Sequence, residues 1–249
     1  MKLLLIHPIL GEMPKEQKKK RRAIFPPLNL AILAGLTSQD VEVELIDENL
    51  EDINYNTDAD LIGITVMTAA ADRAYAIADK FRALGKKVVL GGMHVTALPD
   101  EAQKHADVVC VGEAENYWPE LIEDFKNKQL KPRYGPGVRQ PTFWTPMARR
   151  DLFKSDRYII KNTLQTTRGC PFVCNFCTVS QFFGRTYRFR PIADIVKEVE
   201  QFSHQLVAFV DDNIVGHFKR AKELFKALIP LNIKWVSQAS INIAKDEEL

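Results

Sequence analysis

Over residues 1–127, short apolar runs alternate with longer stretches in which apolar residues recur at helical spacing. Short runs bounded by turn residues are typical of buried strands, and recurrence every three or four residues is typical of helices with one buried face. The expected strands are Lys2–Ile6, Val41–Ile46, Leu61–Val66, Lys87–Leu90 and Val108–Val111. The expected helices are Pro27–Leu36, Ala70–Leu84 and Trp118–Lys126. Strands that alternate with helices predict a parallel sheet covered on both faces.

We expect these elements to form a Rossmann-like, doubly wound domain of the α/β class over residues 1–127. The periodic pattern then lapses over residues 128–158. This stretch is rich in residues that interrupt helices and strands: Pro132, Gly135, Pro136, Gly137, Pro141 and Pro146. Proline and glycine at this density are typical of loops, so we expect a linker or a segment that wraps around a domain.

A second alternation of apolar runs and helical periodicity occupies residues 159–249. The expected strands are Thr163–Thr167, Leu206–Val210 and Lys234–Gln238, and the expected helices are Pro191–Phe202 and His217–Leu228. This order predicts the first part of a parallel (β/α) partial TIM barrel, with a further helix starting at Asp246–Leu249. A complete barrel needs about 30 residues for each strand–helix unit. We therefore expect the chain to be a fragment, truncated within the barrel, of a longer protein.

The overall charge does not favour a nucleic-acid or membrane partner. The net charge is only +2, from 34 basic and 32 acidic residues. The one basic run, Lys15–Arg22, contains no aromatic side chain and is expected to be a solvated loop, with a nucleic-acid patch or the periphery of a bound corrinoid as the alternatives. No apolar run approaches the ~20 residues of a membrane span, and the stretch Met1–Ile6 is too short for a signal peptide. We expect a cytoplasmic protein with no integral membrane segment and no nucleic-acid partner.

Three of the four cysteines lie close together, in the loop after the first expected strand of the second domain. Cys170, Cys174 and Cys177 have the spacing C-x3-C-x2-C, whereas Cys110 stands alone in an apolar strand and is expected to be a small buried side chain. Clustered cysteines in a reducing compartment indicate metal binding or catalysis rather than disulfides, and thiolates select iron–sulfur clusters and zinc. A closed zinc site needs a fourth Cys or His, and the next one is the distant His204. The loop favours a [4Fe-4S] cluster with one iron open, with a zinc site or a chance clustering of cysteines as the alternatives.

The cysteine loop resembles that of the radical S-adenosylmethionine superfamily. The resemblance rests on the cysteine spacing, on Phe176 directly before the last cysteine, and on the place of the loop after the first strand of an α/β unit. It implies that S-adenosylmethionine chelates the open iron, and that one electron from the cluster cleaves the sulfonium to release a 5'-deoxyadenosyl radical. Such chemistry belongs to the cofactor, while the protein orients and shields it. The resemblance also implies a flavodoxin- or ferredoxin-type electron donor.

The same resemblance suggests residues for the S-adenosylmethionine site. Phe176 is expected near the adenine, with loop packing as its alternative. Asp211 and Asp212 end the second strand, where the superfamily often has a Gly-Gly-Glu-type motif that contacts the methionine amino group. One of the two aspartates is expected to take that role, with helix capping as the alternative. Gln238 and Ser240 end the third strand and are candidates for contact with the ribose or the carboxylate.

A Rossmann-like domain ahead of such a loop is similar to the cobalamin-binding subfamily of these enzymes. The similar segments are Pro26–Leu30, Gly63–Thr65, Gly91–His94 and Val111–Glu113. Glycine-rich loops at the carboxyl ends of strands let a large ligand approach the backbone. The implied cobalamin contacts are Thr65, Gly91, Gly92, His94, Gly112 and Glu113. The alternative is a domain kept as a scaffold or substrate platform without cobalamin.

The sequence lacks the Asp-x-His motif whose histidine ligates cobalt in many other cobalamin domains. His7 and His94 are the nearest candidates by position. For both, a hydrogen-bonding role is expected rather than direct ligation of the metal.

These observations lead to a hypothesis of an enzyme that moves a methyl group to an unactivated carbon of a small-molecule or lipid-like substrate. The family resemblance implies a [4Fe-4S] cluster, S-adenosylmethionine and cobalamin as its cofactors. Three alternatives stay open: a radical cyclase, oxidase or rearrangement enzyme with the same cofactors, a noncatalytic cobalamin- or metal-binding fragment, and a zinc-bearing regulatory module.

Overall fold

The computed structural model describes residues 1–11, 21–135 and 143–249, which separate by their contacts into two units. The first unit comprises Met1–Ala23, Pro27–Arg139 and Thr145–Arg157, and the second comprises Ile24–Pro26, Gln140–Trp144 and Tyr158–Leu249. Most of the basic run and part of the expected linker lie outside the described residues.

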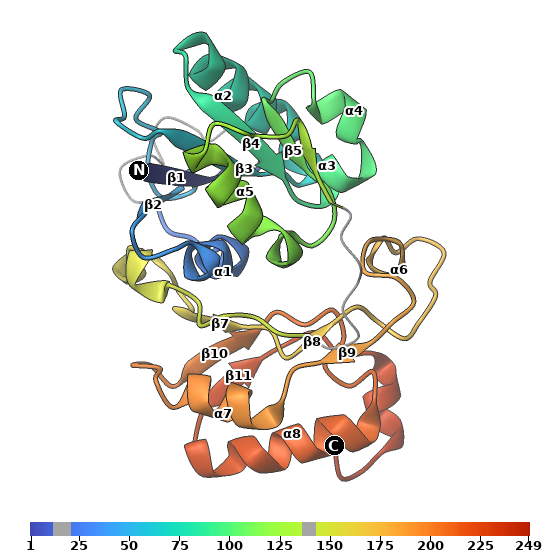
Figure 1. Ribbon diagram of the computed structural model, residues 1–249. Coiled ribbons are helices and arrows are strands. Elements are labelled where there is room, and N and C mark those ends of the chain that lie inside the picture. The colour runs from blue at the N-terminus through green and yellow to red at the C-terminus, as the bar shows by residue number, and fades with distance from the viewer. Residues whose placement is uncertain (12–20, 136–142) are drawn as a thin grey trace. The chain divides into compact units, whose positions relative to one another are not determined.

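The first unit is built on a six-stranded sheet in which all paired strands are parallel (Figure 1). The strands are β1 (Lys2–His7), β2 (Glu42–Asp47), β3 (Leu61–Thr65), β4 (Lys87–Gly91), β5 (Val108–Cys110) and β6 (Arg133–Tyr134). Their order is β2-β1-β3-β4-β5-β6, so the strand order reverses between β1 and β3. This doubly wound order confirms the predicted Rossmann-like class, and such sheets bind ligands at the carboxyl ends of strands beside the reversal point.

Helices cover both faces of this sheet, with α2, α3 and α4 on one face and α1 and α5 on the other (Figure 1). They are α1 (Leu28–Leu36), α2 (Ala71–Ala83), α3 (Met93–Ala97), α4 (Pro99–Ala102) and α5 (Trp118–Lys126). Short 3-10 turns are η2 (Thr68–Ala70), η3 (Ala114–Asn116), η4 (Arg150–Leu152) and η5 (Ser155–Arg157). Residues 3–6 of the interior strand β1 are buried without interruption, because a sheet covered on both faces has no polar side.

The second unit contains a parallel three-stranded sheet of order β11-β10-β7. Its strands are β7 (Asn162–Leu164), β10 (Leu206–Phe209) and β11 (Lys234–Val236). The helices α7 (Ile192–Val199) and α8 (Phe218–Leu228) connect them and bury one apolar face in a shared core. An antiparallel pair, β8 (Thr167–Arg168) and β9 (Arg188–Phe189), encloses the cysteine loop and α6 (Val179–Phe182). The 3-10 turns η6 (Ile229–Leu231) and η7 (Ile241–Lys245) complete the unit.

The strand expected over residues 163–167 is divided in the structure. It ends at Leu164, and the chain enters the antiparallel pair at Thr167. The cause is Asp211, whose carboxylate accepts the backbone N–H groups of Thr166 and Thr167 in place of a neighbouring strand. The polar residue at the end of β10 therefore sets where the first strand of the second unit stops.

The expected start of a helix at residues 246–249 is wrong. These residues form a turn in which the N–H of Leu249 donates to the carbonyl of Asp246. Lys222 of α8 pairs with Asp246 and Glu248, each at 2.8 Å. The acidic side chains that suggested a helix start instead hold the turn against α8.

Candidate functional site

Four of the candidate cobalamin contacts lie at one edge of the first unit, at the carboxyl ends of adjacent strands. Thr65 and Gly91 are the last residues of β3 and β4 and are paired in register. Gly92 follows directly, and Gly112 lies just beyond the end of β5, which is the next strand in the sheet. The parallel sheet therefore brings together glycine-rich loops that are far apart in sequence.

Gly92 is required by the backbone around it. Its φ of +112° is in the region that favours glycine, and a Cβ there would lie 2.8 Å from the carbonyl oxygen of Val66. The N–H of Val66 donates to the carbonyl of Gly91 at 2.7 Å, and the N–H of His94 donates to that of Val66 at 3.2 Å. The loop after β4 thus closes on the chain after β3, which fixes the backbone that faces this edge.

Thr96 joins two of the glycine loops, and sequence reasoning missed it. Its hydroxyl donates to the carbonyl of Gly92 at 2.9 Å and accepts the N–H of Gly112 at 2.9 Å. A threonine four residues after a glycine at a helix start is the available sequence signal, because its hydroxyl can reach back to that carbonyl. Thr96 thereby couples the ends of β4 and β5.

Both ring nitrogens of His94 have partners within the first unit. The buried imidazole places Nδ1 3.3 Å from the hydroxyl of Thr68 and Nε2 3.2 Å from a carboxylate oxygen of Glu101. The hydroxyl of Tyr75 donates to the same oxygen of Glu101 at 3.0 Å. The hydrogen bond from His94, followed by that from Tyr75, lowers the pKa of Glu101. This arrangement favours a hydrogen-bonding role for His94 over direct ligation of a metal.

The helix that opens at Pro26–Leu30 is tied to the reversal point of the sheet. Asn29 in the first turn of α1 donates from Nδ2 to the hydroxyl of Thr65 at 2.9 Å. Two segments that suggested cobalamin binding are therefore in direct contact at the place where doubly wound sheets bind ligands.

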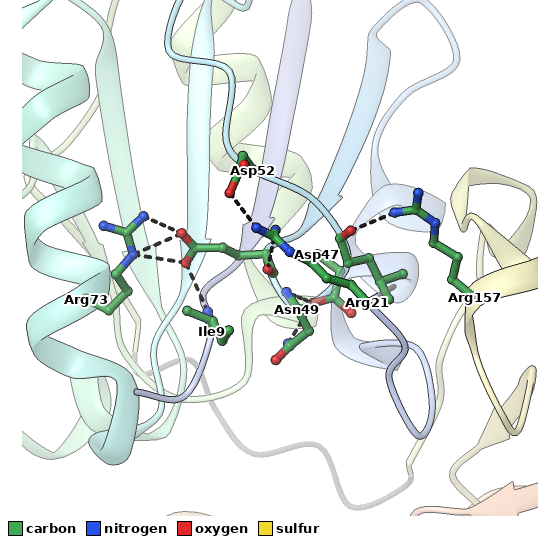
Figure 2. A network of polar contacts seen from close by, with 9 residues as sticks. Ile9, Arg21, Asp47, Asn49, Asp52, Arg73 and Arg157 are labelled. Atoms are coloured by element: carbon green, nitrogen blue, oxygen red, sulfur yellow. Dashed lines mark hydrogen bonds and ion pairs between the residues drawn. The ribbon is translucent and has the colours of Figure 1, made fainter. Parts of the chain in front are cut away.

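A partly buried charge network fixes the other side of this edge (Figure 2). Glu48, which follows β2, accepts the N–H of Ile9 at 3.0 Å and pairs with Arg73 of α2. Arg21 donates to the carbonyl of Glu48 at 3.4 Å and to Asp52 at 2.7 Å. The network anchors the loop after β1 to the loop after β2.

His7 ends β1 beside this network and is half-buried. Burial lowers the pKa of His7, against the opposing effects of Asp47 and Glu48, which favours the neutral imidazole. Its Nδ1 is buried and has no hydrogen-bond partner among the described residues. A nitrogen without solvent access does not present itself to a ligand at the surface of the edge.

In the second unit, the cysteine loop begins at a residue that has to be glycine. Gly169 has a φ of +85°, and a Cβ there would lie 2.3 Å from the carbonyl oxygen of Thr186. Beyond it, Cys170 and Cys177 are half-buried and Cys174 is exposed. Among the described residues, no three His, Cys, Asp or Glu side chains lie close enough together to hold a metal ion. The donor set nevertheless fits an iron–sulfur cluster, because one short loop supplies three thiols.

The structure separates the two aspartates that the sequence left as equal candidates. Asp211 is 1% exposed and accepts the N–H of Thr166 at 3.0 Å and its hydroxyl at 2.9 Å, together with the N–H and hydroxyl of Thr167. Burial raises the pKa of Asp211 to about 6, against these hydrogen bonds. Its oxygens are occupied by the chain between β7 and β8.

Asp212 has a free carboxylate oxygen at the entrance of the cysteine loop. It accepts the backbone N–H of Gly169, and burial raises its pKa. Its second oxygen, Oδ2, is buried and has no hydrogen-bond partner in the described part of the chain. Asp212 is therefore the aspartate that is available to a ligand.

The ends of β10 and β11 meet beside this loop through Asn213. The N–H of Ser240 donates to Oδ1 of Asn213 at 3.0 Å, and the N–H of Ile214 donates to the carbonyl of Gln238 at 3.0 Å. The hydroxyl of Ser240 is buried and has no hydrogen-bond partner among the residues described, whereas the side chain of Gln238 is exposed. The structure thus brings Ser240 and Gln238 to the loop after β10.

All the predicted contacts with S-adenosylmethionine and cobalamin stay predictions, including those of Phe176 and Glu113. The side chain of Phe176 is 91% exposed on the cysteine loop, so its placement near an adenine stays a prediction. Glu113 lies at the end of β5 beside Gly112, half-buried, and its contact with cobalamin also stays a prediction.

The chain is similar to known proteins in both sequence and fold. Residues 19–122 match the B12 binding domain family. Over 87% of its length the chain is 37% identical to bacteriochlorophyllide d C-8(2)-methyltransferase from Chlorobaculum tepidum, of which it covers 52%. The cobalamin-dependent S-adenosylmethionine radical enzyme OxsB, with aqua-cobalamin and S-adenosylmethionine bound, matches with a TM-score of 0.72 and 16% identity, over 94% of this chain and 38% of OxsB. The radical S-adenosylmethionine methyltransferase TsrM from Kitasatospora setae, with cobalamin and [4Fe-4S] cluster bound, matches with a TM-score of 0.66 and 17% identity, over 92% of this chain and 52% of TsrM.

Thr65, Gly91, Gly92 and Gly112 form what we call the glycine-lined edge of the sheet. The doubly wound sheet with this edge is a B12 binding domain, and the same chain continues into an α/β unit with three clustered cysteines. The chain is similar in fold to radical S-adenosylmethionine enzymes that bind cobalamin, the resemblance that the cysteine loop suggested. It spans about half the length of the Chlorobaculum tepidum relative. Within the described residues, no helix combines the length and apolar character needed to cross a membrane.

Proposed function

We propose that this chain binds cobalamin in its first unit and a [4Fe-4S] cluster in its second, and serves a methyltransferase that acts on an unactivated carbon. The observation that carries the proposal is the presence of a B12 binding domain and a C-x3-C-x2-C loop in one chain. The similarity to a named methyltransferase over 87% of the chain supports methyl transfer over a cyclase, oxidase or rearrangement reaction.

In this proposal the thiolates of Cys170, Cys174 and Cys177 hold three irons of the cluster. When bound, the cluster supplies the electron that cleaves S-adenosylmethionine, and cobalamin carries the methyl group. The chain itself positions these groups: Gly169 sets the direction of the cysteine loop, and Asp211 holds the strand end from which that loop departs.

The S-adenosylmethionine site is formed by the polar ends of β10 and β11. The unpartnered oxygen of Asp212 is suited to accept hydrogen bonds from an ammonium group, because a buried carboxylate oxygen without a donor is otherwise unfavourable. The unpartnered hydroxyl of Ser240 and the exposed side chain of Gln238 are suited to hydroxyl or carboxylate groups. Phe176 supplies an aromatic face on the same loop as the thiols.

Cobalamin lies in this proposal against the glycine-lined edge of the first unit. Its contacts are Thr65, Gly91, Gly92, His94, Gly112 and Glu113. Asn29 and Thr96 support that edge through their hydrogen bonds to Thr65 and Gly92. The substrate is a small organic molecule, and the electron donor is a small electron-transfer protein of the flavodoxin or ferredoxin kind.

The test is product analysis on anaerobically reconstituted chain supplied with hydroxocobalamin, S-adenosylmethionine and a strong reductant. We expect S-adenosylhomocysteine, the product left after methyl transfer, and 5'-deoxyadenosine, the product of reductive cleavage. The triple variant Cys170→Ala, Cys174→Ala, Cys177→Ala is expected to lose iron and 5'-deoxyadenosine while it retains cobalamin. Cys110→Ala is the matched control, because that thiol is buried within the first unit, and it is expected to retain both cofactors. Wild-type chain that binds iron and cobalamin but releases neither product would contradict the proposal.

A further inference from the structure

Asn213 occupies a position that nothing in the cysteine spacing singles out. It is 3% exposed and follows the aspartate pair at the end of β10. Its backbone carbonyl accepts the N–H of Gly216 at 3.1 Å and the hydroxyl of Tyr187. The backbone at Asn213 is therefore held from two directions before its side chain is considered.

The carboxamide of Asn213 has only one orientation that satisfies its surroundings. Oδ1 accepts the N–H of Ser240 at 3.0 Å, so the amide nitrogen Nδ2 faces the other way. In that direction it lies 4.0 Å from the sulfur of Cys170. The side chain thus links the end of β11 to the first cysteine of the loop.

Gly216 shows how closely this turn packs on the cysteine loop. A Cβ at Gly216 would lie 3.0 Å from Pro171, the residue after Cys170, and 3.0 Å from the ring of Tyr187. The turn after β10 is therefore in close contact with the cysteine loop, which fixes the distance between Asn213 and the sulfur from the backbone side as well.

We infer that Asn213 is a positioning residue for the cluster: its amide donates to the sulfur of Cys170 and sets the reduction potential. The inference rests on the proposed function, because it requires a cluster on Cys170. Reduction adds negative charge that is shared by the coordinating sulfurs, and an N–H donor stabilises that charge, so such hydrogen bonds raise the reduction potential. A donor buried beside Cys170 has a larger effect than one in water.

The choice of an amide at position 213 has a chemical reason. An aspartate would keep the acceptor for the N–H of Ser240 but would lose the donor to Cys170. It would also add a negative charge at a buried position beside Cys170. Both changes disfavour the reduced cluster.

The variant Asn213→Asp tests this inference, with Asn213→Ala as a second variant and Gln201→Ala as the control. Gln201 is an exposed carboxamide of the same unit that follows α7. The measurements are iron and sulfide content, the unfolding midpoint, and an electron paramagnetic resonance redox titration. We expect both Asn213 variants to shift the midpoint potential to more negative values, the Asp variant further than the Ala variant, and Gln201→Ala to match the wild type.

The outcomes separate this inference from the proposed function. Wild-type chain that takes up no iron would overturn the proposed function and the inference together. A wild-type cluster whose potential is unchanged in Asn213→Asp would overturn the inference alone. If neither variant retains a cluster, the inference is tested by electron paramagnetic resonance of wild-type protein whose asparagine side chains are labelled with 15N. We expect a 15N coupling to the reduced cluster that persists in Asn175→Ser, and its absence there would overturn the inference.

Discussion

At the scale of single residues, the two neighbouring aspartates after β10 have different roles that their sequence does not distinguish. The carboxylate of Asp211 receives hydrogen bonds from the backbone and hydroxyl groups of Thr166 and Thr167. Asp212 keeps one buried oxygen without a hydrogen-bond partner among the described residues. Asp211 therefore holds the fold around the site, and Asp212 is left for a ligand.

Asp211→Ala is expected to destabilise the second unit. The substitution leaves the buried N–H groups of Thr166 and Thr167 without their acceptor, at a cost of about 3 kcal/mol in the free energy of unfolding. Asp194→Ala, at an exposed position in the first turn of α7, is expected to cost less than about 1 kcal/mol. Urea unfolding followed by circular dichroism measures both, and equal effects of the two substitutions would contradict the role of Asp211.

The same residue gives a pH dependence whose sign follows from its burial. Burial raises the pKa of Asp211 from 3.8 to about 6, so the folded chain binds this proton more tightly than the unfolded chain. At a pH between 3.8 and about 6, the folded chain holds a proton on Asp211 that the unfolded chain releases. Raising the pH through this range therefore favours unfolding. The stability of the wild type is expected to fall relative to that of Asp211→Asn as the pH rises from about 4 to about 6. Urea midpoints measured across this range test the prediction, and parallel curves for the two proteins would refute it.

At the scale of elements, the long periodic segments could be predicted from the sequence and the shortest ones could not. The strands β1 to β5 and the helices α1, α2 and α5 lie where the apolar pattern places them. The two-residue strand β6 falls in a stretch rich in proline and glycine, because two paired residues leave no periodic signal. The pair β8 and β9 depends on Asp211, a residue distant in sequence, so no local pattern reveals it.

Some candidate cofactor residues could likewise be predicted from the sequence, and others could not. Strand-end glycines and clustered cysteines are visible in the sequence because their residue types are distinctive. Thr96 and Asn213 make hydrogen bonds to residues of other segments, among them Gly112 at 2.9 Å and Cys170 at 4.0 Å. Contacts of this kind depend on the fold, and the sequence alone does not show them.

Gly92→Ala is expected to lower the free energy of unfolding by more than an ordinary glycine-to-alanine substitution does, and to disturb the glycine-lined edge. The matched control is Gly85→Ala, where φ is +78° and a Cβ would meet nothing within 4 Å, so the expected cost is about 1 kcal/mol. At Gly92 the added Cβ also meets the backbone of Val66, which adds a further cost of about 1–3 kcal/mol. Unfolding midpoints and cobalamin absorbance of the two variants test this, and cobalamin binding should weaken only in Gly92→Ala. Equal behaviour of the two variants would count against a fixed backbone at Gly92.

The position of α7 depends on a buried ion pair between Glu198 and Arg190. Their side chains are 2% and 6% exposed. Glu198→Ala leaves the guanidinium buried without this partner and is expected to cost about 3–5 kcal/mol. Glu200→Ala, at an exposed position after the same helix, is expected to cost less than about 0.5 kcal/mol. Urea unfolding compares them, and a cost at Glu198 as small as that at Glu200 would contradict this role for the pair.

At the scale of the whole molecule, two units with separate cores carry two different kinds of site. The first is a B12 binding domain, and the second presents three thiols together with the unpartnered polar groups of Asp212 and Ser240. The central claim is that the second unit holds a [4Fe-4S] cluster with one iron open to S-adenosylmethionine.

Electron paramagnetic resonance of anaerobically reconstituted, dithionite-reduced chain, with and without S-adenosylmethionine, tests this claim most directly. We expect the signal of a reduced [4Fe-4S] cluster, and we expect it to change when S-adenosylmethionine is added, because the cofactor coordinates the iron that lacks a thiolate. A folded chain that gives no iron signal, or a cluster signal that S-adenosylmethionine leaves unchanged, would contradict the account.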